Sequence, residues 1–488
     1  MCNTSYVTGG EKVLLLLARE IQQHYECVLI IPQDGMIAQQ ARSAGIQTII
    51  QAIPLSAGLY LSLPNADEEI ATLQRGAEWS ELYSLLERER PDYVLVNTAV
   101  HPLPALAAQC LGITTLWLMH EILLDTPYRA HCAAYIALHC DVLIGVSEAV
   151  LRPFLGVSGV KQQFVLSPFI EQEALAPKDW AAIRSAMRSR IGWDESHRVV
   201  GFIAAAIYPN KGLLAFIESM IPIAGMNDRA RFLIVGSPVD LVHDQACRQV
   251  IVQSGYEHRF AFLPFVDNIS HLFPTLDIVA VPSIIAEGFG LTALEGLTFG
   301  RAVVAFASGG LVEIMRATGN GDFLVQTGNT HEMMWKVRSL LASDRYLEDV
   351  GNRNREAAVQ AFGIHAFRRK LQQLVGQLPV RAMLRFTLVR GSGPAIYAIE
   401  QGRKRPFASV KAMIQRGFQP GGVAPVSDLM LSCFPEGEPL PELRRSVRKK
   451  SKRLHHLRRR RGRNRLRALR RRRRVSRRTR RRQSPTKR

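Results

Sequence analysis

The sequence lacks the long apolar segments of membrane-spanning chains and the cysteine pairs of zinc or redox motifs. Near the N-terminus the apolar run Val13–Ala18 is only six residues long, too short for a signal-peptide core or a bilayer span. Seven cysteines are scattered along 488 residues and none of them forms a Cys-x-x-Cys pair, so a zinc ribbon or a thiol redox motif has little support. An odd, dispersed set is typical of reduced thiols in a cytosolic protein.

Acidic and aromatic residues are both absent from Arg444 to Arg488, a segment that holds 26 Lys and Arg residues. This segment alone carries a formal charge of +26, whereas the other 37 basic and 42 acidic residues give residues 1–443 a net charge of −5. The body of the chain is therefore not a basic nucleic-acid-binding domain. Because the segment repels itself and has no rings on which bases could stack, we expect residues 444–488 to be a disordered polybasic tail.

Short runs of Val, Ile and Leu alternate with helical patterns through most of the chain, which predicts parallel sheets wound with helices. A first series of apolar runs extends to Val142–Val146, and a second begins at Val199–Ile203 after a charged helical stretch. We therefore predict two Rossmann-like α/β domains, over residues 1–180 and 181–378. Turn signals between short strand-like runs then predict a small accessory module at 379–443, ahead of the tail at 444–488.

Only eight residues precede the Gly9-Gly10 pair at which the first predicted helix begins. A doubly wound domain normally opens with a central strand and a loop, and eight residues are too few for both. The sequence therefore indicates that this chain starts downstream of its first strand, or that Asn3 to Val7 forms a poor substitute for that strand.

The segment from Pro282 to Ile314 carries the strongest chemical signal. An apolar strand ends at Pro282, a loop presents Glu287-Gly288-Phe289-Gly290, and a helix follows. Backbone amides at such a junction suit an anionic group such as a diphosphate, because glycine permits close approach. Glu287 and Glu295 would lie roughly 10 Å apart by helix rise, so two carboxylates could hold opposite ends of one ligand. The plain alternative is a helix-start acid at 287 and a solvated helix residue at 295.

This segment resembles the defining motif of glycosyltransferase family 4, the retaining enzymes of the GT-B fold. The chain matches that motif with one extra residue between Ser283 and Glu287, and weaker similarity extends from about Gly9 to Gly376. The resemblance implies an α/β fold of the GT-B class, with two Rossmann-like domains facing a cleft. The matching residues are Pro282, Ser283, Glu287, Gly288, Phe289, Gly290, Glu295, Gly300, Gly309, Gly310 and Glu313.

The resemblance also implies a role for each residue of the candidate site. Glu287 would contact the donor sugar hydroxyls, Lys211 would neutralise the diphosphate, and His120 would lie beside the sugar from the opposite domain. Glu295 would contact the ribose of the nucleotide, and Gly10 would let a loop of the first domain approach the ligands. The remaining substrate-binding positions, whose backbone would meet the diphosphate and sugar, are Gly288, Phe289, Gly290 and Leu291.

The chain departs from the family at positions that usually supply a second cation. Ala205 and Ala206 stand where many members have Gly-Arg, and Asn210 stands where others have an Arg before the lysine. Lys211 is therefore the only cation that this loop offers a diphosphate. No Asp-x-Asp triplet occurs, so we expect no metal site, with Lys211 and the helix amides in place of a metal cation.

The sequence thus predicts retaining transfer of a hexose from a nucleotide diphosphate sugar, which is a co-substrate, to an acceptor hydroxyl without a separate cofactor. The acceptor would be a glycan or a lipid-linked molecule in cell-surface glycan or polysaccharide synthesis. Two alternatives stay open: a nucleotide-sugar epimerase of the same fold, and a catalytically weak binding or anchoring protein. For the location we expect the cytoplasm, with attachment to the inner face of the membrane if residues 444–488 bind an anionic lipid surface or another polyanion. A specific nucleic-acid partner is not expected, and a solvated tail without a partner is the plain alternative.

Overall fold

The Val- and Ile-rich runs form buried parallel strands in a computed structural model of the chain. The structure describes residues 1–2, 9–159, 161–171, 175, 179–266, 268–379 and 388–443. Two successive α/β regions are present, which we call the N-lobe (residues 1–171) and the C-lobe (residues 179–363), and this confirms the predicted α/β class. Within the described ranges, no helix has both the length and the apolar character that crossing a bilayer requires.

The C-lobe contains one six-stranded parallel sheet with the order β12-β11-β10-β7-β8-β9. Its earliest strand in the chain, β7, lies between β8 and β10, so the strand order reverses direction there. A crevice at the carboxyl ends of two such central strands is the usual ligand site of a doubly wound sheet. The strands are β7 (Arg198–Ile207), β8 (Ala230–Pro238), β9 (Phe260–Leu263), β10 (Ile278–Val281), β11 (Ala302–Phe306) and β12 (Leu324–Val325).

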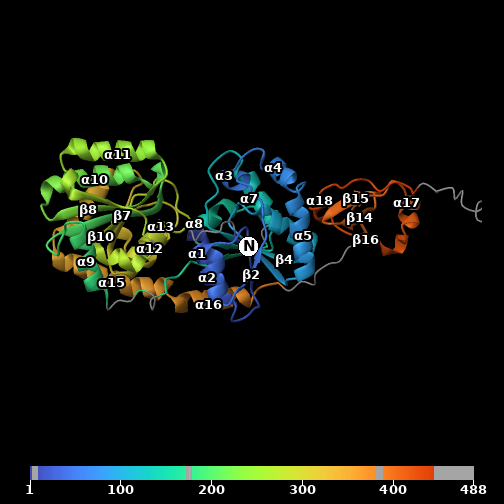
Figure 1. Cartoon of the computed structure of the whole chain (residues 1–488), viewed down its shortest axis with the longest axis horizontal. Coiled ribbons are helices and arrows are strands. Elements are labelled where there is room, and N and C mark those ends of the chain that lie inside the picture. Colours follow the sequence, from blue (N-terminus) through green and yellow to red (C-terminus); the bar gives the residue numbers. More distant parts are fainter. Residues whose placement is uncertain are drawn as a thin grey trace, which may run out of the picture. The chain divides into compact units, whose positions relative to one another are not determined.

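Helices cover both faces of this sheet, and α10 and α11 lie on the face opposite α12 and α15 (Figure 1). The strands are consequently apolar on both sides, and all four residues of β10 and all five of β11 are buried. The longer helices are α9 (Trp180–Arg190), α10 (Leu213–Met226), α11 (Leu241–Ser254), α12 (Leu291–Thr298), α13 (Leu311–Ala317), α14 (Thr330–Leu341) and α15 (Asp344–Phe362).

The N-lobe contains two smaller parallel sheets, β1-β2 and β3-β4-β5-β6. The strands are β1 (Val28–Ile31), β2 (Gln47–Ile50), β3 (Tyr93–Asn97), β4 (Thr114–Met119), β5 (Val142–Gly145) and β6 (Gln162–Val165). The helices are α1 (Gly9–Ile21), α2 (Met36–Ser43), α3 (Gly58–Leu61), α4 (Ala66–Leu73), α5 (Ala77–Glu89), α6 (Pro102–Cys110), α7 (Arg129–Leu138) and α8 (Glu148–Leu151), followed by the short turn η1 (Arg152–Phe154).

Met1 and Cys2 connect the two sheets of the N-lobe. The ammonium of Met1 donates to the carbonyl of Leu95 in β3 at 2.7 Å, and the amide of Cys2 donates to the carbonyl of Ile30 in β1 at 2.9 Å. Consecutive residues that bond to opposite sides behave as a strand between two neighbours. The predicted substitute strand from Asn3 to Val7 lies outside the described residues.

Helix α16 (Ile364–Val375) follows the C-lobe and packs on the N-lobe. The guanidinium of Arg368 pairs with the carboxylate of Glu20 in α1 at 2.6 Å, and the ring of Phe367 lies 4.6 Å from that of Phe169. The last part of the predicted second domain therefore contacts the first.

The C-terminal residues 388–443 form a small four-stranded sheet with the order β15-β14-β13-β16. Contacts divide the chain into two compact units, residues 1–405 with 423–437, and residues 406–422 with those from 438 onward. Expectations for the tail at 444–488 fall outside the described residues. The elements are β13 (Leu388–Arg390), β14 (Tyr397–Glu400), β15 (Arg403–Pro406), α17 (Val410–Gln415), β16 (Ala424–Pro425) and α18 (Asp428–Ser432).

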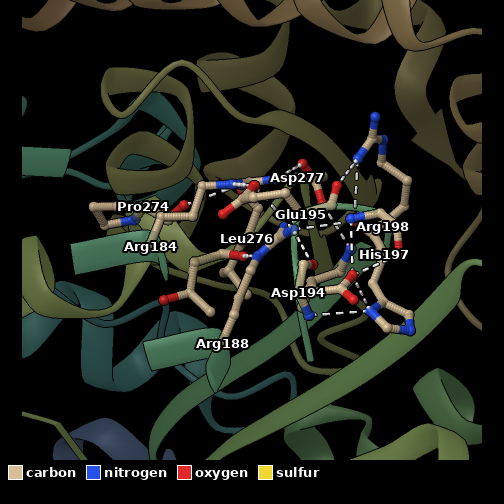
Figure 2. A network of polar contacts seen from close by, with 12 residues as sticks. Arg184, Arg188, Asp194, Glu195, His197, Arg198, Pro274, Leu276 and Asp277 are labelled. Atoms are coloured by element: carbon tan, nitrogen blue, oxygen red, sulfur yellow. Dashed lines mark hydrogen bonds and ion pairs between the residues drawn. The ribbon is translucent and has the colours of Figure 1, made fainter. Parts of the chain in front are cut away.

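A buried ion-pair network fixes α9 to the amino ends of the central C-lobe strands (Figure 2). The carboxylate of Asp277, which precedes β10, accepts from Arg184 at 2.8 Å, from Arg188 at 2.7 Å and from the backbone amide of Val199 at 2.7 Å. Arg188 is fully buried, and Asp277 at 2.7 Å is the nearer of its two carboxylate partners, the other being Glu195 at 3.5 Å. Burial alone would raise the pKa of Asp277, but the two guanidinium groups outweigh it and hold that pKa below 3.8.

We expect the substitution Asp277→Asn to destabilise the protein by about 3 to 5 kcal/mol, because the buried Arg188 would keep only the 58% exposed Glu195, at 3.5 Å, as a counter-charge. Since the folded pKa of Asp277 is depressed, its contribution is present above pH 3.8 and is lost as the pH falls through the folded pKa. Denaturant unfolding at pH 7 and at pH 3 measures both effects, and the variant should lose less stability on acidification than the parent. The fully exposed Asp228, paired with Arg259 at 2.9 Å, supplies the control Asp228→Asn, and equal losses in the two variants would contradict the assignment.

Candidate functional site

Lys211 and Glu287 meet at the carboxyl ends of the two central C-lobe strands. Lys211 follows β7 and Glu287 follows β10, and the Lys211 ammonium lies 2.7 Å from the Glu287 carboxylate. The hydroxyl of Ser283 donates to the same carboxylate. Gly212, with a φ of 80°, makes this approach possible, since a Cβ there would lie 1.9 Å from the carbonyl oxygen of Pro282.

The N-terminus of α12 lies directly after this loop and presents its free amides. Gly290 precedes the helix with a φ of 109°, a conformation that favours glycine. Phe289 is buried with its ring 5.7 Å from that of Phe362, so its backbone rather than its side chain is available to a ligand. The predicted amide positions thus come together at one helix end.

Glu295 lies in the second turn of α12 and is only 7% exposed. The alternative of a solvated residue at this position is therefore wrong. Its carboxylate pairs with the ammonium of Lys12, in α1 of the N-lobe, at 3.1 Å. Burial raises the pKa of Glu295, and Lys12 offsets this only in part.

Gly288 is the point at which the loop after β10 meets the N-lobe. A Cβ at residue 288 would lie 1.8 Å from the carbonyl oxygen of His120, so no other residue fits without displacing backbone. The hydroxyl of Ser147 donates to the carbonyl of Gly288 at 2.5 Å. The carboxylate of Glu313 accepts from the amides of Glu148 and Ala149 at 2.8 and 2.7 Å, which joins α13 to the start of α8.

His120 follows β4 and is oriented by Asn97 at the end of β3. Its Nε2 lies 2.7 Å from the Asn97 side-chain oxygen, which accepts a hydrogen bond from that nitrogen. Burial lowers the pKa of His120 to about 4, so the imidazole is neutral at pH 7. A Cβ on Gly10 would lie 3.6 Å from the ring, which places the Gly9-Gly10 turn against His120.

Three side chains near the site were missed by sequence reasoning. Lys12 and Asn97 contact predicted site residues directly, as described above. Burial raises the pKa of the Tyr60 phenol, and the carboxylates of Glu121 and Glu287 raise it further, so this phenol lies near the Glu287 loop. The position of Lys12, directly after Gly-Gly-Glu, was the only sequence signal for any of the three.

Metal-binding side chains do not gather at this site. In the part of the chain that the structure describes, no group of three or more His, Cys, Asp or Glu residues could hold a metal ion. Lys12 and Lys211 supply positive charge next to Glu295 and Glu287, and the amides at the start of α12 add to it.

Two protein-family models match the two lobes in turn. The model for Glycosyltransferase Family 4 matches residues 7–170, and the model for Glycosyl transferases group 1 matches residues 197–343. Together the two matches support a glycosyltransferase of the family 4 type. An uncharacterised glycosyltransferase of Methanocaldococcus jannaschii is 32% identical over 170 residues, which cover 34% of this chain and 40% of that protein. A D-inositol 3-phosphate glycosyltransferase of Mycobacteroides abscessus is 30% identical over 181 residues, 36% of this chain and 38% of that protein. The chain thus spans about two fifths of the length of these curated relatives.

Solved structures similar to this chain are GT-B glycosyltransferases, which confirms the predicted fold class. HepE from Anabaena, solved in complex with UDP and glucose, superposes with a TM-score of 0.64 at 19% identity and covers 77% of this chain and 98% of HepE. Sucrose-phosphate synthase from Thermosynechococcus elongatus superposes with a TM-score of 0.59 at 18% identity, covering 76% of this chain and 94% of that protein.

We expect His120 to contribute to acid sensitivity, because its folded pKa lies below the usual 6.5. A depressed pKa means that its stabilising contribution is complete above pH 6.5 and is lost as the pH falls towards 4. The fall in melting temperature between pH 7 and pH 5 should therefore be smaller in His120→Gln than in the parent. The exposed His365 supplies the control His365→Gln, which should follow the parent. Parallel pH curves for the parent and His120→Gln would show that His120 titrates normally.

Proposed function

We propose that this protein transfers a hexose from a nucleotide diphosphate sugar to an acceptor hydroxyl with retention of anomeric configuration. The observation that carries this proposal is the α12 N-terminus, flanked by the Lys211–Glu287 and Lys12–Glu295 pairs and facing His120. Amides and ammonium groups suit the diphosphate, while carboxylates suit the sugar and ribose hydroxyls. HepE has been solved with UDP-glucose, so UDP-glucose is the first donor to test here.

Each site residue takes a role that its geometry allows. As the bond between the anomeric carbon and the phosphate oxygen breaks, negative charge grows on the departing diphosphate, where Lys211 and the α12 amides stabilise it. The acceptor oxygen attacks from the same face and its proton passes to the departing phosphate oxygen. Glu287 accepts hydrogen bonds from the sugar hydroxyls. His120 lies beside the sugar and is neutral, so it does not repel the positive charge that develops on the sugar ring.

Replacing Glu287 or Lys211 by alanine should reduce donor turnover by about a hundredfold or more, the loss typical of removing one electrostatic contact to a transition state. The measurement is release of nucleoside diphosphate from a panel of UDP-, GDP- and ADP-sugars in the presence of acceptors. Lys370→Ala and Glu348→Ala, at exposed positions of α16 and α15, are matched controls that should keep parental rates.

The same panel separates this proposal from its alternatives. Turnover that survives both Glu287→Ala and Lys211→Ala would show that the site is elsewhere. A new sugar isomer formed from donor alone would identify an epimerase, and failure to bind any nucleoside diphosphate would identify a binding protein of another kind.

We further propose that the acceptor carries an anionic group. A cavity of about 290 Å³ beside the Glu287 loop is lined by Arg129 and Arg152 of the N-lobe and by Ala286 and Gly309 of the C-lobe. Arg129 pairs with the 82% exposed Asp125 at 2.9 Å, a contact that water weakens. Two neighbouring guanidinium groups at a cavity suit a phosphate, and the mycobacterial relative is named for a phosphorylated acceptor. Polyol phosphates and lipid-linked glycans both carry such a group.

We expect Arg152→Ala and Arg129→Ala each to raise the KM for a phosphorylated acceptor by roughly tenfold to a hundredfold, the value of a charge-assisted hydrogen bond. The KM for the matched acceptor without phosphate should not change. Initial rates with paired acceptors, such as glycerol 3-phosphate and glycerol, measure this selectivity, and Arg345→Ala at an exposed position is the control. Equal effects on both acceptors of a pair would rule out phosphate recognition by these arginines.

A further inference from the structure

We infer that Lys12 is the second cation of the donor site and binds the diphosphate from the N-lobe. This inference rests on the proposed function and adds a residue to its site. It begins from a deficit, since Ala205, Ala206 and Asn210 leave the loop after β7 with Lys211 as its only cation. A diphosphate carries more charge than one ammonium balances, so a second cation near the α12 N-terminus has a clear electrostatic role.

The geometry places Lys12 at that helix end. Lys12 lies in the first turn of α1, which begins at Gly9. A Cβ on Gly9 would lie 3.6 Å from the side chain of Leu291, the first residue of α12. The Lys12 ammonium reaches across to the carboxylate of Glu295 at 3.1 Å. A flexible four-carbon stem lets the ammonium move along the helix towards the free amides.

The surroundings of Lys12 allow it to change partner. Its side chain is 43% exposed, whereas that of Glu295 is 10% exposed. The lysine can therefore leave without being buried, and the carboxylate stays in place. Lys211 is placed in the same way, 33% exposed and paired with Glu287 at 2.7 Å.

The two lysine–glutamate pairs thus lie close to the α12 N-terminus, one in the loop before the helix and one at its second turn. When the donor enters, each ammonium moves from a carboxylate to a phosphate, and each carboxylate becomes free to accept hydrogen bonds from hydroxyls. Lys12 belongs to the N-lobe and Lys211 to the C-lobe, so a diphosphate bound by both connects the lobes.

The alternative is that Lys12 only keeps Glu295 ionised and oriented. A double-mutant cycle separates the two roles, with calorimetric affinities for UDP and uridine at low and moderate salt. Lys12→Ala should weaken UDP binding by roughly tenfold or more, leave uridine binding unchanged, and reduce the salt dependence of UDP binding. The same loss should appear when Lys12→Ala is made in a Glu295→Gln background.

An unchanged UDP affinity on adding Lys12→Ala to Glu295→Gln would overturn the inference. Lys12→Arg, which keeps the charge, should retain most of the affinity, and Lys370→Ala is the control for a lost surface lysine. Melting temperatures of all variants show whether each one folds. If the parent binds neither UDP, GDP nor ADP, the proposed function fails; if the parent binds and the Lys12 variants bind equally, only this inference fails.

Discussion

The site depends on the backbone contact between Gly288 and the carbonyl group of His120. Any side chain at residue 288 would require the loop after β10 and the loop after β4 to separate. Two further sets of hydrogen bonds also join the two lobes here, from Ser147 to the carbonyl of Gly288 and from the α8 amides to Glu313. They too form only if the loop after β10 lies this close to the N-lobe. The proximity of His120 to the α12 N-terminus follows from it. The absence of a side chain at Gly288 therefore allows His120 and the α12 N-terminus, which are far apart in the sequence, to lie close together.

Charge at the site is balanced within the protein. Lys211 pairs with the carboxylate of Glu287 and Lys12 with that of Glu295, so the charges of these four side chains cancel within the protein. In the binding mode proposed above, each ammonium exchanges a carboxylate for a phosphate, and the number of charge pairs stays the same.

Much of the fold could be predicted from the sequence because its signals are local. Val- and Ile-rich runs such as those of β10 and β11 give parallel strands, and the Glu-Gly-Phe-Gly loop before an apolar helix indicates the family. The spacing of Glu287 and Glu295 also placed them on one loop and helix. What could not be predicted arises from contacts between distant residues. Lys12 and Glu295 are 283 positions apart in the sequence. The sequence of α12 alone therefore could not predict that Glu295 contacts the N-lobe.

The Asp277 network lies at the amino ends of β7 and β10, whereas Lys211 and Glu287 follow the carboxyl ends of the same strands. The ion-pair network that stabilises the sheet and the residues of the candidate site therefore lie at opposite edges of one sheet. The loops of the candidate site can vary in sequence while the ion-pair network at the opposite edge of the sheet stays intact. A scaffold divided in this way can acquire new sugar or acceptor preferences without first becoming more stable, which helps to explain how one architecture serves enzymes with such different substrates.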